Sequence, residues 1–192
     1  MELQELQSIL NNKSKVVIVT HKNPDGDAMG SSLGLSGVLK KKGCDVVVIA
    51  PTEYPDFLNW LKGNEEVLVW GKNNKHIKKS INEADILFCL DFNALHRIDE
   101  VGELISKAKG KKVMIDHHQQ PDDFVDYMMS DTSASLTAEM VYEFIEKLGD
   151  DNLVDGNIGE ALYCGIMTDT GSFRFPSTTF KTHIIVGKII QK

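Results

Sequence analysis

The chain has 192 residues, a formal net charge of −7, and 42% hydrophobic and 26% charged residues. This is the composition of a globular protein with room for one sizeable core, and the acidic balance argues against a basic face built for long duplex nucleic acid. Three scattered cysteines, no apolar run long enough for a bilayer and no signal-peptide pattern at the start predict a cytoplasmic protein.

Apolar runs and helical periods alternate through the first half of the chain. Leucines at helical spacing predict a surface helix over residues 1–12. Strands are expected at 16–20 and 46–50, on either side of a helix over 28–42 that ends at Gly43 and whose glycines allow close packing on a sheet. Prolines and Gly-Asn pairs break any period over residues 51–80, where only a short helix at 57–61 and a strand at 67–70 are indicated.

The second half continues the alternation. Its expected strands are at 86–91, 112–116 and, at a sheet edge, 127–130, and its expected helices are at 100–109, 134–148, 157–167 and 181–192. Ser133 and Ser135 are expected to cap the helix over 134–148. The order predicts an α/β fold, a mostly parallel β-sheet flanked by helices in a Rossmann-like, three-layer arrangement. We expect a catalytic domain over residues 1–180, with the helix 181–192 as a candidate start of a linker.

Acidic and imidazole side chains follow four of the apolar runs, and together they suggest a metal centre. An apolar run that stops at carboxylates is typical of a buried parallel strand that delivers ligands to the carboxyl edge of its sheet. The clusters comprise His21, Asp25 and Asp27; Asp91; Asp116, His117 and His118; and Asp169. Leaving aside Asp116 and one of the two adjacent histidines, the clusters supply four carboxylates and two imidazoles. These suit Mn²⁺ or a similar ion better than a structural zinc, and two such ions would activate a shared hydroxide for displacement at phosphorus.

Each cluster also has a plainer interpretation. Asp25 or Asp27 could cap the helix that follows them, and Asp91 could pair with Arg97 or cap a short helix. The two histidines could be a solvated pair at the start of a loop, and Asp169 a turn residue.

The adjacent histidines carry a geometric expectation of their own. Neighbouring side chains in an extended chain point in opposite directions, so we expect only one of His117 and His118 to reach the metal ions while the other faces the substrate. Asp116 is placed to fix a histidine tautomer. The remaining histidines, among them His96, have no ligand spacing and are expected at the surface.

The pattern H-x-x-x-D-x-D, a lone strand-end D, D-H-H and a later D in G-I-x-x-D-T-G resembles the DHH phosphoesterase family. All four motifs occur in order between residues 21 and 175. The resemblance implies roles for nine residues. His21 and Asp25 would hold one metal ion, Asp27 and His117 the other, with Asp91 bridging and Asp169 completing the cage. His118 would contact the scissile phosphate, Asp116 would support the histidines and Arg97 would help to hold phosphate.

Within the family, the spacing and the G-I-M-T-D-T-G-S-F loop look most like the bacterial oligoribonuclease (nanoRNase) and pAp phosphatase branch. Members degrade very short oligoribonucleotides and dephosphorylate 3′-phosphoadenosine 5′-phosphate (pAp), and relatives cleave cyclic di-AMP or its linear product. The resemblance implies two divalent ions, Mn²⁺ first and Mg²⁺ or Co²⁺ as substitutes. It implies a short oligonucleotide or nucleotide substrate and no membrane or long duplex partner, and leaves a homodimer open.

The likeness covers the catalytic DHH domain only. The nuclease branch continues into a smaller DHHA1-type domain with a glycine-rich GGGH-type motif, which nothing in this sequence matches. Two other functions stay open. An inorganic pyrophosphatase would turn over pyrophosphate but not dinucleotides, and a non-catalytic nucleotide- or metal-binding module would bind without hydrolysis.

Overall fold

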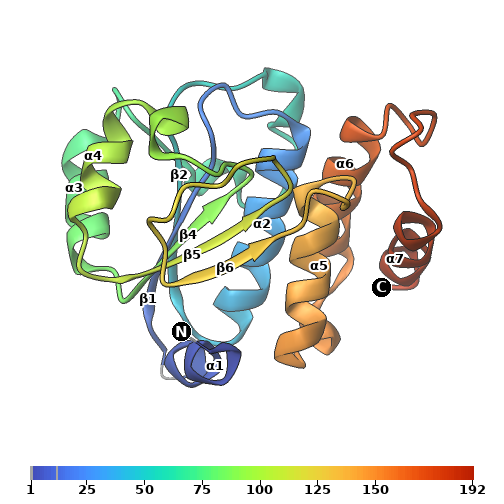
Figure 1. Ribbon diagram of the computed structural model, residues 1–192, viewed down its shortest axis with the longest axis horizontal. Helices are drawn as coiled ribbons and strands as arrows, with labels where there is room; N and C mark the ends of the chain where they lie inside the picture. Colours follow the sequence, from blue (N-terminus) through green and yellow to red (C-terminus); the bar gives the residue numbers. More distant parts are fainter. Residues whose placement is uncertain (1, 12) are drawn as a thin grey trace.

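The computed structural model describes residues 2–11 and 13–192, and its centre is a six-stranded sheet (Figure 1). The strand order is β3-β2-β1-β4-β5-β6, and all five neighbouring pairs are parallel. The predicted α/β fold with a mostly parallel sheet is therefore confirmed. The strands are β1 (Lys15–Val19), β2 (Asp45–Ala50), β3 (Leu68–Val69), β4 (Ile86–Leu90), β5 (Lys111–Asp116) and β6 (Tyr127–Ser130).

Helices cover both faces of the sheet. Helices α2 and α5 pack on one face, where α1 adds its leucines to the same core, and α3 and α4 pack on the other (Figure 1). Helix α6 packs on α2, and α7 packs outside α6. The helices are α1 (Leu3–Asn11), α2 (Gly26–Lys41), α3 (Asn74–Glu83), α4 (Glu100–Lys107), α5 (Thr137–Leu148), α6 (Gly156–Asp169) and α7 (Phe180–Ile190). The ends of the helix expected over 1–12, Met1 and Asn12, lie outside the described residues.

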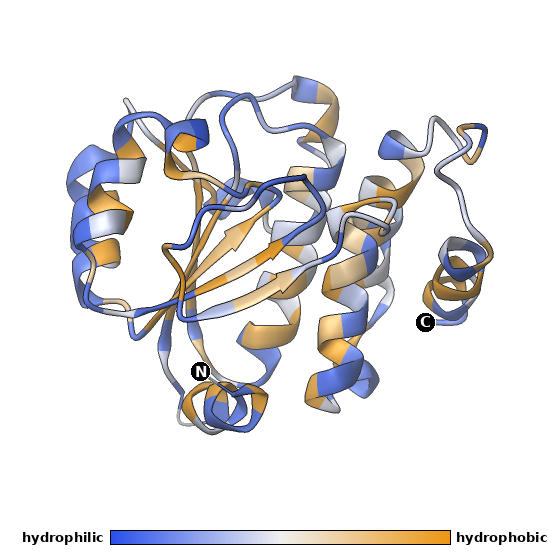
Figure 2. Ribbon diagram, viewed as in Figure 1, coloured by the Kyte–Doolittle hydropathy of each residue, from blue (hydrophilic) through white to orange (hydrophobic). Residues whose placement is uncertain are grey.

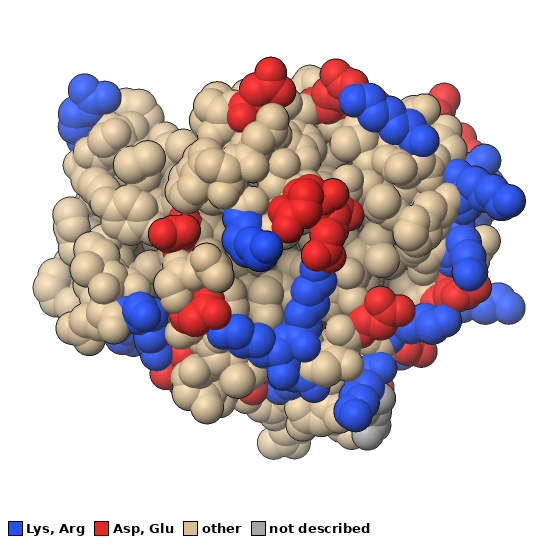
Figure 3. Space-filling model, turned by 180° about the vertical axis from the view of Figure 1, so that it is seen from behind, with Lys and Arg blue, Asp and Glu red and all other residues tan. Residues whose placement is uncertain are grey.

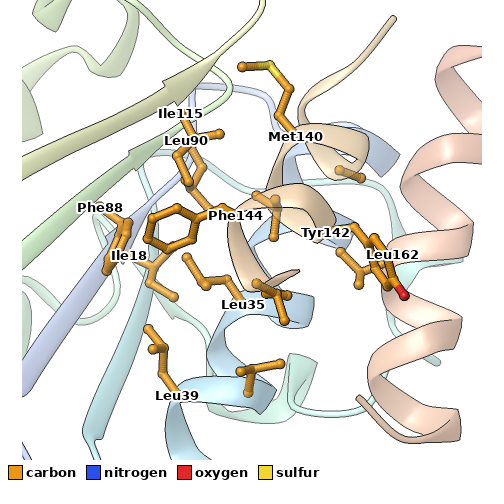
Figure 4. Close-up of a cluster of buried hydrophobic side chains, with 14 of the residues drawn as sticks. Ile18, Leu35, Leu39, Phe88, Leu90, Ile115, Met140, Tyr142, Phe144 and Leu162 are labelled. Atoms are coloured by element: carbon orange, nitrogen blue, oxygen red, sulfur yellow. The ribbon is translucent and has the colours of Figure 1, made fainter. Parts of the chain in front are cut away.

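The central strands are apolar on both sides because helices bury both faces of the sheet. Ile18 and Phe88 face α2 and α5 in the cluster of Figure 4, where the Phe88 and Phe144 rings meet edge to face with centroids 5.8 Å apart. Cys89 points to the opposite face and packs with α3 and α4. In Figure 2 the strands are mainly hydrophobic, and the helices on either side of them carry both hydrophobic and hydrophilic residues.

Three elements differ from expectation. Helix α3 was not predicted, because its inner side offers only Ile77 and Ile81 in a polar segment. Helix α5 begins at Thr137, three residues later than expected. Helix α6 runs on to Asp169, which therefore ends a helix instead of lying in a loop.

The surface fits the acidic composition. Basic and acidic side chains are interspersed over the face in Figure 3, and neither sign covers it. Among the described residues, no helix combines the length and the apolar character that a membrane crossing requires.

The chain reverses its direction of travel across the sheet between β1 and β4. From β1 it proceeds to β2 and β3 on one side, and it then returns to place β4 on the other side of β1. In doubly wound sheets the loops at such a switch point part and leave a crevice at the carboxyl ends of the strands, where ligands bind.

The glycines of α2 pack against helix α6 and not, as expected, against the sheet. A Cβ on Gly30 would collide with the carbonyl oxygen of Ala161 and come within 2.8 Å of the Gly165 nitrogen, whereas a Cβ on Gly34 would meet the Leu162 side chain at 2.6 Å. Backbone cannot move aside as a leucine side chain can, so only the first contact forces the two helices apart.

We expect Gly30→Ala to lower the free energy of unfolding by about 2 kcal/mol, because overpacking exceeds the gain in helix propensity. Gly34→Ala is the matched control, with a loss below about 1 kcal/mol. Urea denaturation of both variants measures the difference. Equal losses would show that the contact between the helix backbones does not limit their approach.

Candidate metal centre

The acidic and imidazole side chains singled out in the sequence meet at the carboxyl edge of the sheet, beside the switch point. They arrive on strand ends and helix ends: after β1, at the start of α2, after β4, at and after the end of β5, and at the end of α6. Among the described residues they form three overlapping groups, each with ligand atoms within 4.8 Å of one another: His21, Asp25 and Asp91; Asp27, His117 and Asp169; and Asp91, His117 and His118.

His21 presents one ring nitrogen to two carboxylates. Its Nδ1 lies 2.7 Å from the Lys22 carbonyl oxygen, to which only a protonated nitrogen can donate. Its Nε2 lies 3.4 Å from Asp91 Oδ2 and 3.9 Å from Asp25 Oδ1. Burial would lower the pKa of His21, but Asp91 and the Lys22 carbonyl together raise it. A lone pair that faces two carboxylates needs a cation between them, either a proton or a metal ion.

Asp91 lies at the centre of the cluster, only 3% exposed. Its φ is +64°, a left-handed conformation that is uncommon outside glycine and that aspartate and asparagine adopt more readily than most residues. Its Oδ1 accepts the Thr137 hydroxyl at 2.8 Å and lies 3.6 Å from His117 Nε2. Burial would raise the pKa of Asp91, but His21, Thr137 and His117 outweigh it and lower the pKa.

Asp27 has a structural task as well. Its two carboxylate oxygens accept the backbone N–H groups of Thr137 at 2.6 Å and Ala138 at 2.7 Å, so it caps helix α5 from 110 residues away. Burial, followed by the charges of Asp91 and Asp169, raises the pKa of Asp27 well above its usual range.

Asp169 is the second carboxylate in the group that contains Asp27 and His117. Burial, followed by the charges of Asp25 and Asp91, raises the pKa of Asp169 to about 6. Carboxylates held this close repel one another, and divalent cations relieve that repulsion.

The Asp-His-His segment differs from expectation in one respect. The two imidazoles lie side by side, with centroids 4.6 Å apart, and both approach Asp91. The expectation that they point in opposite directions was wrong, because β5 ends at Asp116 and strand alternation does not continue beyond it. Asp116 accepts the His118 backbone N–H at 2.9 Å and lies 2.7 Å from His118 Nδ1, so it supports one histidine and not both.

Two of the plainer interpretations can be decided. Asp25 does cap α2: its Oδ1 accepts the N–H groups of Asp27 and Ala28 at 3.0 and 3.1 Å, and the same oxygen lies 3.9 Å from His21 Nε2. Among the described residues Asp91 pairs with histidines and not with Arg97, whose guanidinium lies 3.2 Å from His118 Nε2.

The expected serine caps of α5 are wrong. Ser133 donates to Asp131 and Ser135 donates to the Ser177 carbonyl, while the α5 amides go to Asp27.

The donor set fits hard or borderline divalent cations. The three groups contain only carboxylate oxygens and imidazole nitrogens, and the three cysteines are buried elsewhere in the core. Such donors suit Mn²⁺, Mg²⁺ or Co²⁺ and not a cysteine-rich structural zinc.

A doubly wound parallel sheet with this cluster at its switch point defines an α/β protein with a candidate metal centre. Residues 15–166 match the DHH family, N-terminal domain, so the chain belongs to the DHH family. The expected family is thereby confirmed.

Similar proteins of known sequence or structure are longer than this chain. The bifunctional oligoribonuclease and PAP phosphatase NrnA of Bacillus subtilis is 32% identical over 178 residues, 92% of this chain and 52% of the relative. The protein of the same name from Thermus thermophilus is 35% identical over 164 residues, which are 85% of this chain and 46% of that relative. An exopolyphosphatase-related protein from Bacteroides fragilis superposes with a TM-score of 0.96 at 38% identity, covering 99% of this chain and 56% of that chain. The chain spans about half the length of the curated relatives it matches.

Proposed function

We propose that this chain is the catalytic domain of a metal-dependent phosphoesterase that hydrolyses short oligonucleotides, pAp or both. The observation that carries the proposal is the convergence of six candidate ligands, Asp91 and five others, at the carboxyl edge of the sheet beside its switch point. The names of the NrnA relatives supply the substrate class.

The proposed ligand assignment follows two of the three groups and leaves His118 of the remaining group for the phosphate. His21 and Asp25 would hold one divalent ion, and Asp27, His117 and Asp169 the other. Asp91 would serve both, since its two oxygens face different histidines, His21 on one side and His117 on the other. When bound, two such ions lower the pKa of water and neutralise phosphate charge.

Residues beside the ions would handle the phosphate. Arg97 offers fixed N–H donors that match phosphate oxygens, and its place beside His118 Nε2 directs both groups at one anion. The Asp116 carboxylate holds the proton on His118 Nδ1 and would stabilise the imidazolium. In its imidazolium form, with Nε2 no longer accepting from Arg97, His118 would donate the Nε2 proton to the leaving-group oxygen as water attacks phosphorus and the ester P–O bond breaks.

Hydrolysis assays with this chain test the proposal. With Mn²⁺ we expect release of mononucleotide from a dinucleotide, or of phosphate from pAp, and EDTA should abolish both because it removes the ions that would activate water and neutralise the phosphate. Turnover of pyrophosphate alone would favour a pyrophosphatase. Calorimetric binding of pAp without turnover of any of the three substrates would favour a non-catalytic module.

A further inference from the structure

One residue at the start of helix α5 contacts two of the candidate metal ligands at once. The Thr137 hydroxyl donates to Asp91 Oδ1 at 2.8 Å, and the Thr137 backbone N–H donates to Asp27 Oδ2 at 2.6 Å. Thr137 is not a member of any of the three ligand groups found among the described residues. Its influence on bound ions would therefore be exerted through these two carboxylates.

The Thr137 hydroxyl supports Asp91 in a way that the neighbouring histidines do not. Thr137 is fully buried, and a buried hydroxyl needs a partner inside the protein. On the part of the chain that the structure describes, the other groups that approach the Asp91 carboxylate are the imidazoles of His21, His117 and His118. A ring nitrogen that binds an ion can no longer donate to a carboxylate. With ions bound to His21 and His117, the Thr137 hydroxyl would be the hydrogen bond that still orients Asp91.

This support reaches only one of the two Asp91 oxygens. Oδ1, which accepts the Thr137 hydroxyl, lies 3.6 Å from His117 Nε2, whereas Oδ2 lies 3.4 Å from His21 Nε2. The terminal torsion of an aspartate is broad, so the carboxylate is free to turn unless a partner fixes it. The hydroxyl thus fixes the oxygen on the His117 side, while the oxygen on the His21 side does not touch it.

We propose that Thr137 is a positioning residue whose hydroxyl holds Asp91 Oδ1 in place for the ion of the group that contains His117. The inference rests on the proposed function for the presence of divalent ions at this centre, and it involves no substrate. Partners that orient metal ligands typically contribute roughly ten- to a hundredfold to metal affinity. Because the bond is made to Oδ1, its loss should weaken the ion beside His117 and spare the ion beside His21.

Calorimetric titration of the metal-free chain with Mn²⁺ tests the proposal without any substrate. Thr137→Val removes the hydroxyl, nearly keeps the shape of the side chain and leaves the backbone N–H that donates to Asp27. We expect two bound ions in the wild type and, in the variant, a loss of about tenfold or more in affinity for one ion, with the other within about threefold. Thr137→Ser, which restores a hydroxyl, should return both affinities to within about threefold of wild type. Thr137→Ala is a second variant without the hydroxyl and should give the same selective loss.

Thr182→Val is the matched control for a role in folding alone. Thr182 is also fully buried, and its hydroxyl donates to a carboxylate oxygen, Glu139 Oε2, at 2.9 Å, between α7 and α5. Urea denaturation in EDTA should show a comparable loss of stability in Thr182→Val and Thr137→Val, since each loses one buried hydrogen bond. The Mn²⁺ affinities of Thr182→Val should equal those of the wild type. A residue with a merely structural role would give that result at position 137 as well.

A double-variant comparison identifies the affected ion. The loss caused by Thr137→Val should persist in a His21→Ala background and vanish in a His117→Ala background. Equal losses in the two backgrounds, or wild-type Mn²⁺ affinities in both Thr137→Val and Thr137→Ala, would overturn the inference. Unchanged Mn²⁺ affinities together with hydrolysis of pAp or a dinucleotide would overturn it and leave the proposed function standing. Selective loss of one ion in a chain that hydrolyses neither substrate would support it and overturn the proposed function.

Discussion

Replacement of Asp91 by asparagine is expected to abolish hydrolysis, with a fall in kcat/KM of at least about a thousandfold, or about 4 kcal/mol of transition-state stabilisation. Asp91 is the carboxylate shared by two of the candidate groups, the one with His21 and Asp25 and the one with His117 and His118. An amide has one acceptor oxygen and no charge, so it cannot serve two cations. Steady-state assays with Mn²⁺ measure the loss.

The asparagine variant should nevertheless fold. Asparagine tolerates the left-handed backbone that residue 91 adopts at φ +64°, and its oxygen can still accept the Thr137 hydroxyl. Asp45→Asn is the control: it removes one charge from the exposed start of β2, at the opposite edge of the sheet. We expect wild-type activity there. If Asp91→Asn kept activity within tenfold of wild type, the ligand assignment would be wrong.

The parts of this fold that could be predicted are those whose signal is local. Central strands such as β4 and β5 are continuous apolar runs because helices bury both their faces, and the carboxylates that end them mark the edge where ligands gather. Helix α3 could not be predicted, since two isoleucines carry its only apolar side.

The unpredicted parts of the site depend on tertiary contacts. No local pattern links Asp27 to the amides of Thr137 and Ala138, so the cap of α5 was assigned to nearby serines. The left-handed backbone conformation of Asp91 could not be predicted either, because the apolar residues before it indicate only a strand. His96 was expected at the surface, where it does lie, but its place in a pocket with Lys22 depends on the packing of two loops. For Lys22 and His96 the sequence did offer a hint, because each is adjacent to a candidate site residue: Lys22 follows His21, and His96 precedes Arg97.

Asp27 and Asp169 belong to the same candidate group, yet their replacement should affect the fold in opposite ways. Alanine at either position is expected to remove activity, since each takes a carboxylate from the ions. In EDTA, Asp27→Ala should lower the free energy of unfolding by about 2–4 kcal/mol, because it removes a helix cap and leaves two buried N–H groups without their acceptor. Asp169→Ala should raise it by about 1 kcal/mol, allowing for partial exposure of the group.

The gain at position 169 should depend on pH in a defined direction. The folded protein raises the pKa of Asp169 to about 6 from an ordinary value of 3.8, so the folded state binds the proton more tightly than the unfolded state does. The penalty is therefore fully present above pH 6 and fades as the pH falls towards 4. Urea denaturation in EDTA at pH 7.5, 6 and 4.5 should show the advantage of Asp169→Ala shrinking along that series. An advantage that stayed constant, or a loss of stability equal to that of Asp27→Ala, would show that the charge of Asp169, buried beside other carboxylates, does not destabilise the metal-free centre.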